Sequence, residues 1–351
     1  VLPIINEDIN EEWISDKTRY ACDGLLNQRL DSPFVKYNKK FEKATWNEVF
    51  KIIKSKIQNT NKEKICGFVG DLTNMEAGFI FKEFFDRTID THNYDSRSKQ
   101  SFIDNTLREN YLFNSTINGI EETDLILLIG TNPRFEATML NARIRKAFVA
   151  KKIPIISFGD PGDLTYDYTN VGNSTEDIKK LLNKENEASK IILNSKKPIV
   201  IIGESALELE SGKFILQNIK KFLKENNFIN DNWNAFNVLL QNASSVGAID
   251  LGFFEKDNSF NFFKKLKNNE FKLLYFVGSD NLDFVKSNEF IIYQGSHGDR
   301  MAQIADVILP SPAYTEQNGL FINLEGRLQK SNKSTYPPGS SKEDWKIFNL
   351  I

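Results

Sequence analysis

The chain has 351 residues, a length that suggests about two α/β-sized units rather than one compact domain. Hydrophobic residues make up 40% and charged residues 26% of it, which is ordinary for a globular protein. Its 45 basic residues are balanced by 47 acidic ones, so a net charge of -2 gives no electrostatic reason to expect a nucleic-acid or membrane-surface binder.

The first 43 residues are mixed in character. They hold an acidic stretch at 7–12 and a short segment at 33–37 that we expect to be a strand. Thr45 and Glu48 follow with the spacing of a capping box, which predicts that a helix begins there.

From residue 64 onward, apolar runs end in Gly and a small polar residue, and a helical pattern often follows. The runs lie at 64–70, 124–130, 153–159, 198–203, 271–278 and 290–295, and a last one at 305–309 ends at Pro310. The helical patterns lie at 73–88, 134–150, 173–183, 207–225 and 259–268. Continuous β-branched runs indicate strands buried on both faces. The alternation predicts an α/β fold with doubly wound, mostly parallel sheets in two lobes, with ligand-binding turns at the carboxyl ends of the strands.

The polar segment 183–189 is the best candidate for an internal boundary, and 250–259 is a second break. We therefore expect a short N-terminal segment of mixed structure at 1–43, a first α/β lobe at 44–190, a second at 191–312, and a return segment of extended chain and the start of a truncated helix at 313–351. Residue 1 is Val and the last residues begin a helical pattern, so we expect an excerpt of a longer polypeptide.

Cysteine and histidine are scarce: the chain has Cys22, Cys66, His92 and His297. An iron–sulfur cluster normally takes four cysteine thiolates, and a structural zinc site takes four Cys or His ligands, usually in close pairs. No such pair is present in the sequence. We therefore expect no metal ligands and no metal centre in this segment.

The turn Gly130-Thr131-Asn132-Pro133-Arg134 is the most informative one. Asn132 suits a helix N-cap and Pro133 the first helical position. Arg134 is unusual there, because a cation in the first turn opposes the helix dipole. Its partner is either an acidic side chain or a bound anion. For an acidic partner we expect a residue from another segment, such as Glu325.

Other polar motifs have two interpretations each. His297, between Gly295 and Asp299, could be an acid/base group or a turn residue that hydrogen-bonds its loop. No plausible nucleophile is tied to it by the sequence, which favours the turn. Asp160 and Asp163 have the composition of a tight turn. The acidic stretch 7–12 could bind a cation, but a solvated surface is the simpler interpretation. No catalytic residues stand out.

Three groups of segments carry a family resemblance. They are Glu7–Arg19; Leu128–Ala137 with Asn141–Lys146; and Ile292–Asp299 with Ala305–Pro310, Ala313–Glu316 and Asn323–Arg327. Together they closely resemble the large iron–sulfur subunit of proton-translocating NADH:quinone oxidoreductase, respiratory complex I. The match runs from end to end and is most similar to the alphaproteobacterial and mitochondrial branch.

The resemblance implies that this is the molybdopterin-oxidoreductase-like region of that subunit. The loop Gly130, Thr131, Asn132, Pro133 and Arg134 is similar to loops that hold the pterin nucleotide in molybdenum enzymes. In the complex I branch it is understood as a relic, so no cofactor binding is expected in this segment. Iron–sulfur clusters are expected in upstream domains that the sequence does not contain.

The resemblance therefore implies a structural, non-catalytic part of an enzyme complex whose upstream clusters carry electrons from NADH to quinone. It implies partners among the other peripheral-arm subunits, with neither nucleic-acid binding nor direct membrane insertion. The location implied is the cytoplasmic face of the bacterial inner membrane or the mitochondrial matrix side. One alternative is an active molybdopterin-dependent oxidoreductase of the formate dehydrogenase type. A nucleotide-using α/β enzyme of another family is a third, disfavoured because phosphate-binding motifs are missing.

Overall fold

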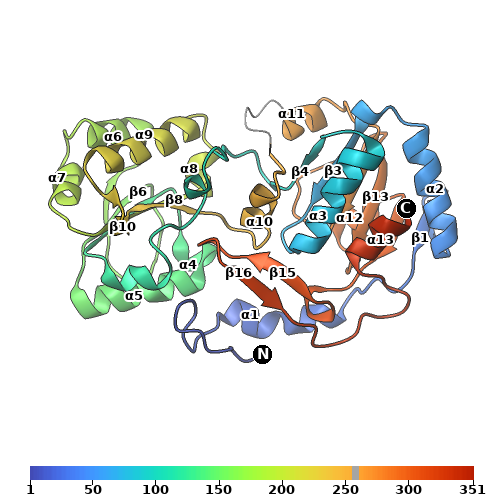
Figure 1. Cartoon of the computed structure of the whole chain (residues 1–351), viewed down its shortest axis with the longest axis horizontal. Helices are drawn as coiled ribbons and strands as arrows, with labels where there is room; N and C mark the ends of the chain where they lie inside the picture. The colour runs from blue at the N-terminus through green and yellow to red at the C-terminus, as the bar shows by residue number, and fades with distance from the viewer. Residues whose placement is uncertain (255–260) are drawn as a thin grey trace. The chain divides into compact units, whose positions relative to one another are not determined.

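The computed structural model describes residues 1–254 and 261–351, which form two compact units. Unit 1 consists of Val1–Cys22, Ser101–Gln241 and Leu324–Gly326, and unit 2 of Asp23–Gln100, Asn242–Asn323 and Arg327–Ile351. Both are α/β structures with mostly parallel sheets, as the sequence predicts (Figure 1).

Unit 1 is built on a five-stranded sheet in which every pairing is parallel. In spatial order its strands are β11 (Phe236–Leu239), β8 (Pro198–Gly203), β5 (Leu125–Ile129), β6 (Ile155–Phe158) and β7 (Thr169–Gly172). Its helices are α1 (Asp16–Tyr20), α4 (Pro133–Glu136), α5 (Thr138–Lys151), α6 (Thr175–Leu182), α7 (Glu187–Leu193), α8 (Glu204–Leu207) and α9 (Gly212–Glu225). A two-stranded ribbon joins β9 (Ile229–Asn230) to β10 (Trp233–Asn234).

The core of unit 1 explains why its strands read as unbroken apolar runs. Successive residues of a strand point to opposite faces of the sheet, so both sets must be apolar when both faces are covered. Ile126 and Leu128 pack with Leu140 and Ile144 of α5 in one buried cluster. Figure 1 shows α5 on one side of this sheet and α6 and α9 on the other.

Unit 2 contains a seven-stranded sheet that is parallel except at one edge, where β1 and β2 run antiparallel. In spatial order its strands are β2 (Lys40–Lys43), β1 (Phe34–Tyr37), β14 (Val307–Pro310), β13 (Phe290–Gly295), β12 (Leu273–Val277), β3 (Ile65–Val69) and β4 (Tyr94–Asp95). Its helices are α2 (Trp46–Gln58), α3 (Met75–Glu83, continued by a π-helical turn at Phe84–Ile89), α10 (Ser245–Asp250), α11 (Phe262–Lys267), α12 (Arg300–Ile304) and α13 (Asp344–Leu350). The hairpin strands β15 (Gly319–Ile322) and β16 (Leu328–Ser331) complete it.

Aromatic side chains fill one face of the unit 2 sheet. Gly67 of β3 lies directly under the rings of Phe81 and Phe85, and a Cβ atom at residue 67 would come within 2.3 Å of Phe81. Tyr275 and Phe348 complete this face with ring centroids 5.4 Å apart. A side chain larger than hydrogen at residue 67 would therefore force the rings of Phe81 and Phe85 to shift.

The predicted strands and most predicted helices are present. The capping box of Thr45 and Glu48 is formed, with α2 beginning at Trp46. The pattern at 207–225 starts late, at Gly212, and the pattern at 134–150 is divided into α4 and α5. The first two residues of the pattern at 259–268 lie outside the described residues, and α11 falls within the rest of it.

The division of the chain differs from the expected one. Residues 191–241 carry β8 and β11, which pair with β5, so the segment 183–189 is only a connection between α6 and α7. Strand β3, expected in the first lobe, pairs instead with β12. Within the expected segment 1–43 the units divide after Cys22. Similar apolar runs recur along the chain, so their composition does not specify which runs become neighbours.

Candidate functional site

The turn Gly130–Arg134 follows β5 at the carboxyl edge of the unit 1 sheet, and α8 packs tightly against it. Gly130 has a φ of 55°, in the left-handed region, and a Cβ there would lie 2.8 Å from the backbone nitrogen of Ala206. A Cβ on Gly203 would lie 2.4 Å from the carbonyl oxygen of Gly130. The two glycines therefore allow the ends of β5 and β8 to approach closely, and protein atoms fill this side of the turn.

The polar groups of the turn bond mainly to its own helix. Asn132 caps α4 through its side chain as predicted, accepting from the backbone N–H of Phe135 at 3.3 Å. The carboxylate of Glu136 accepts from the backbone N–H of Asn132 at 3.1 Å and from the hydroxyl of Thr131 at 2.6 Å. The Asn132 side-chain amide also donates to the carbonyl oxygen of Pro161. A carboxylate of the protein thus takes two donors that the turn would otherwise offer to an external anion.

Arg134 pairs with a carboxylate from another segment, which confirms that part of the prediction. Its guanidinium bonds to Asp163 Oδ2 at 2.5 Å and to the Asp163 carbonyl oxygen at 3.0 Å. The choice of Glu325 is wrong, because the Glu325 carboxylate accepts from the backbone N–H of Ile117 at 2.9 Å. Hydrogen bonds from the backbone of Thr165 and from Arg134 lower the pKa of Asp163. The pair is exposed, with 38% of the Arg134 side chain and 75% of the Asp163 side chain accessible.

The remaining sequence candidates have structural partners. His297 bonds through Nδ1 to the Ser296 hydroxyl of its own loop at 2.8 Å, as the turn interpretation expects, and through Nε2 to the carbonyl of the distant Gly24 at 3.0 Å. Asp160 accepts from the backbone N–H of Gly162 at 2.8 Å, as expected of a tight turn. The Ser296 hydroxyl does lie beside the His297 imidazole, but the second ring nitrogen bonds the Gly24 carbonyl and not a carboxylate that would orient the ring as a base.

Cys66 lies away from the carboxyl end of its strand, where ligands bind in such folds. Cys66 is the second residue of β3 and is buried, and burial raises the pKa of its thiol. Cys22 lies half-buried in a short 3-10 helix. Within residues 1–254 and 261–351, no three His, Cys, Asp or Glu side chains are grouped as metal ligands.

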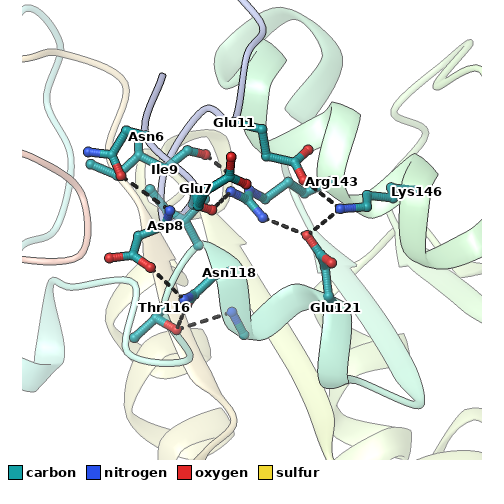
Figure 2. A network of polar contacts seen from close by, with 12 residues as sticks. Asn6, Glu7, Asp8, Ile9, Glu11, Thr116, Asn118, Glu121, Arg143 and Lys146 are labelled. Atoms are coloured by element: carbon teal, nitrogen blue, oxygen red, sulfur yellow. Dashed lines mark hydrogen bonds and ion pairs between the residues drawn. The ribbon is translucent and has the colours of Figure 1, made fainter. Parts of the chain in front are cut away.

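A buried arginine network, which the sequence did not reveal, fixes the acidic stretch to α5 (Figure 2). The Arg143 side chain is 4% exposed and donates to the carbonyl oxygens of Glu7 and Ile9, the latter at 3.0 Å, and to the Glu121 carboxylate at 2.6 Å. Lys146 bridges Glu11 at 2.5 Å and Glu121 at 3.0 Å. The hydrogen bond from Lys146 lowers the pKa of Glu11. The stretch is therefore docked on unit 1 through its backbone and Glu11, whereas the side chains of Glu7 and Glu12 are exposed, as the solvated-surface interpretation expects.

One signal in the sequence could have pointed to Arg143. It lies in the helical pattern 134–150 directly before Ile144, on the side that the apolar periodicity turns inward. An arginine on a buried helix face requires several acceptors, because burying an unpaired charge is costly. The sequence did not indicate which acceptors, since two of them are backbone carbonyls about 135 residues away along the chain.

Comparison with known proteins decides the family. A family model described as molybdopterin oxidoreductase matches residues 29–351. The chain belongs to the molybdopterin oxidoreductase family. Residues 1–23 match a second model, the NADH-ubiquinone oxidoreductase NDSU1/NuoG-like 4Fe-4S domain. The four cysteines of a cluster cannot come from this stretch, which contains only Cys22.

The curated relatives of this chain are named as subunits of NADH-quinone or NADH-ubiquinone oxidoreductases. The chain is 42% identical to an NADH-quinone oxidoreductase subunit of Rickettsia bellii, with all of this chain and 50% of the relative covered. It is 38% identical to the NADH-ubiquinone oxidoreductase 75 kDa subunit of Reclinomonas americana, with all of this chain and 53% of the relative covered. The resemblance seen in the sequence is confirmed, and the chain spans about half the length of these relatives.

A solved structure supports the fold. The formyltransferase/hydrolase complex of Methylorubrum extorquens matches with a TM-score of 0.65 at 12% identity, covering 91% of this chain and 97% of that one. At this identity the likeness concerns the molybdopterin oxidoreductase-like fold alone. None of the helices in the described parts of the chain has the length and apolar character needed to cross a membrane.

Proposed function

We propose that this chain is a structural, non-catalytic framework within the large iron–sulfur subunit of an NADH:quinone oxidoreductase. In this role it carries no pterin, while clusters elsewhere in the subunit transfer electrons from NADH to quinone. Its partners are the other subunits of the peripheral arm, on the cytoplasmic or matrix side of the membrane. The names of the relatives and the match of residues 1–23 to a 4Fe-4S domain model support this assignment.

One observation carries the non-catalytic role: the turn that would hold a pterin diphosphate already has an internal carboxylate. Glu136 accepts hydrogen bonds from Thr131 and Asn132, and a second anion at these donors would be repelled by it. Ala206 packs directly against Gly130, and Gly203 against Gly130 and Thr131, on another side of the turn. The residues present at this turn do not fit a pterin diphosphate, and no catalytic step is derived through one.

A specific observation favours the alternative of a working molybdopterin enzyme. Two polar atoms after strands β3 and β12 of unit 2, Thr73 Oγ1 and Asp280 Oδ1, are buried and have no hydrogen-bond partner among the described residues. A bound ligand could supply partners for them. However, Asp71 and Asp280 place two carboxyl groups in these loops, and their ionised forms would repel a diphosphate.

Cofactor analysis of the full-length subunit separates the two functions. The purified protein is denatured, and the supernatant is assayed for a released pterin nucleotide and for molybdenum or tungsten. The structural role predicts less than about one pterin per ten subunits, together with iron from the clusters. Stoichiometric pterin with metal would refute the structural role and support the alternative.

A further inference from the structure

An open groove in unit 1 is lined by both apolar and charged side chains. It has a volume of about 1000 Å³ and lies between the N-terminal segment and α5. Its apolar lining consists of Ile5, Trp13, Ala142 and Val149. The charged lining residues are Glu7, Glu11, Glu12, Arg145 and Lys146. Protein–protein contacts likewise combine apolar side chains with polar and charged ones.

The apolar side chains of this groove have no role in the core of unit 1. Ile5 is 66%, Trp13 58% and Val149 54% exposed, and the neighbouring Ile4 is 88% exposed. The inward face of α5 is formed by other residues, among them Leu140 and Ile144. Val has a low helix propensity, so helix formation alone gives no reason for Val149 at an exposed position. Clustered exposed apolar residues commonly mark an interaction surface.

The wall of the groove is held in place, so the surface is preformed. Arg143 binds the backbone of Glu7 and Ile9, and Lys146 binds Glu11, as Figure 2 shows. The side-chain amide of Asn10 donates to the carbonyl oxygens of Ile4 at 2.9 Å and of Trp13 at 3.1 Å. These bonds fix the segment that presents the apolar side chains. A fixed surface loses little conformational entropy when a partner covers it.

The same segment identifies the occupant. Residues 1–23 match the model of a 4Fe-4S domain, yet they contain a single cysteine, and a cluster takes four thiolates. The remainder of such a domain must supply the other ligands and must adjoin this segment. We propose that the groove lined by Ile5, Trp13 and Val149 is the docking surface of the cluster-bearing remainder of that 4Fe-4S domain. This inference rests on the proposed assignment to a large iron–sulfur subunit.

Thiol accessibility in the full-length subunit tests the docking. Val149→Cys reports on the groove, and Leu209→Cys is a matched control, because Leu209 is also 54% exposed in unit 1 and does not line the groove. Ile5→Cys is a second groove reporter. The rate of maleimide labelling at each position is followed by peptide mass spectrometry, which distinguishes the new thiols from the natural ones. We expect both groove positions to react at least tenfold more slowly than residue 209.

Every other outcome contradicts the proposal. Equal rates at residues 149 and 209, with the cluster content unchanged, would show that the groove is open in the subunit. Protection that arises only in the assembled complex would assign the groove to another subunit. Neither result bears on the non-catalytic role, which the pterin assay tests separately, so the two failures can be distinguished.

Discussion

Arg29 and Glu316 form the buried ion pair whose loss we expect to destabilise unit 2 most clearly. Only 10% of the Arg29 side chain and 5% of the Glu316 side chain are exposed, and the contact is bidentate, with Nη1 to Oε1 at 2.6 Å. Arg29 also donates to the carbonyl oxygens of Leu25 at 2.8 Å and Ser296 at 3.2 Å. The pair thereby connects the chain before β1 to the 3-10 turn Tyr314–Glu316 after β14, and the bond to Ser296 adds the loop after β13.

The size of the effect follows from burial. In Arg29→Met the Glu316 carboxylate loses both guanidinium donors and keeps the hydrogen bond from the backbone N–H of Ala313. It is then buried either as a charge without a cation or in its protonated form. Removing one partner of a buried pair typically costs about 3–5 kcal/mol. The double variant Arg29→Met/Glu316→Met should recover most of this loss, because apolar replacement of both partners is often neutral.

Native-state hydrogen exchange of the buried strand β14 measures this loss within unit 2 alone. If its amides exchange through unfolding of the unit, Arg29→Met should accelerate their exchange by about two to three and a half powers of ten. Arg134→Met is the matched control, because that ion pair is exposed and its loss should cost less than about 1 kcal/mol. Equal effects of the two substitutions, each followed in its own unit, would refute the reasoning that burial sets the cost.

Three further changes test other parts of the structure. Gly203→Ala places a Cβ atom 2.4 Å from the Gly130 carbonyl oxygen and should lower the free energy of unfolding of unit 1 by about 1–3 kcal/mol, whereas Gly24→Ala, with no heavy atom within 4 Å, should be nearly neutral in urea unfolding. Arg143→Met should release the N-terminal segment, which would appear in mass spectrometry as faster hydrogen exchange of the backbone amides of residues 6–11. Unchanged exchange would show that Arg143 does not hold this segment in place. Burial raises the pKa of Asp344 in the folded protein above its ordinary value of about 3.8. The folded state therefore keeps this proton more tightly than the unfolded chain, and its stability falls as pH rises from that ordinary value through the raised one. Asp344→Asn should therefore become more stable relative to the natural protein as pH rises over that range, and a pH-independent difference in urea midpoint would contradict this.

Local features of the chain were predictable because their causes are local. Apolar runs that end in Gly130, Gly203 and Gly278 became buried parallel strands, since a strand covered on both faces needs apolar residues on both. The N-cap of Asn132 and the capping box of Thr45 depend on atoms within four residues and formed as expected. The family, too, was recognisable from short motifs in the sequence.

The tertiary structure alone decided which distant residues meet. Strand β3 pairs with β12, about 200 residues later, although β5 or β8 would offer the same apolar pattern, so the expected lobe boundaries were wrong. Arg134 has Asp163 and not Glu325 as its partner, because the turn after β6 lies beside the turn after β5 at the edge of the sheet. Arg143 binds backbone carbonyls, which every residue possesses and which therefore leave no mark in the sequence. The residue types of a segment determine which of its side chains are buried, whereas long-range packing determines which neighbouring segment covers them.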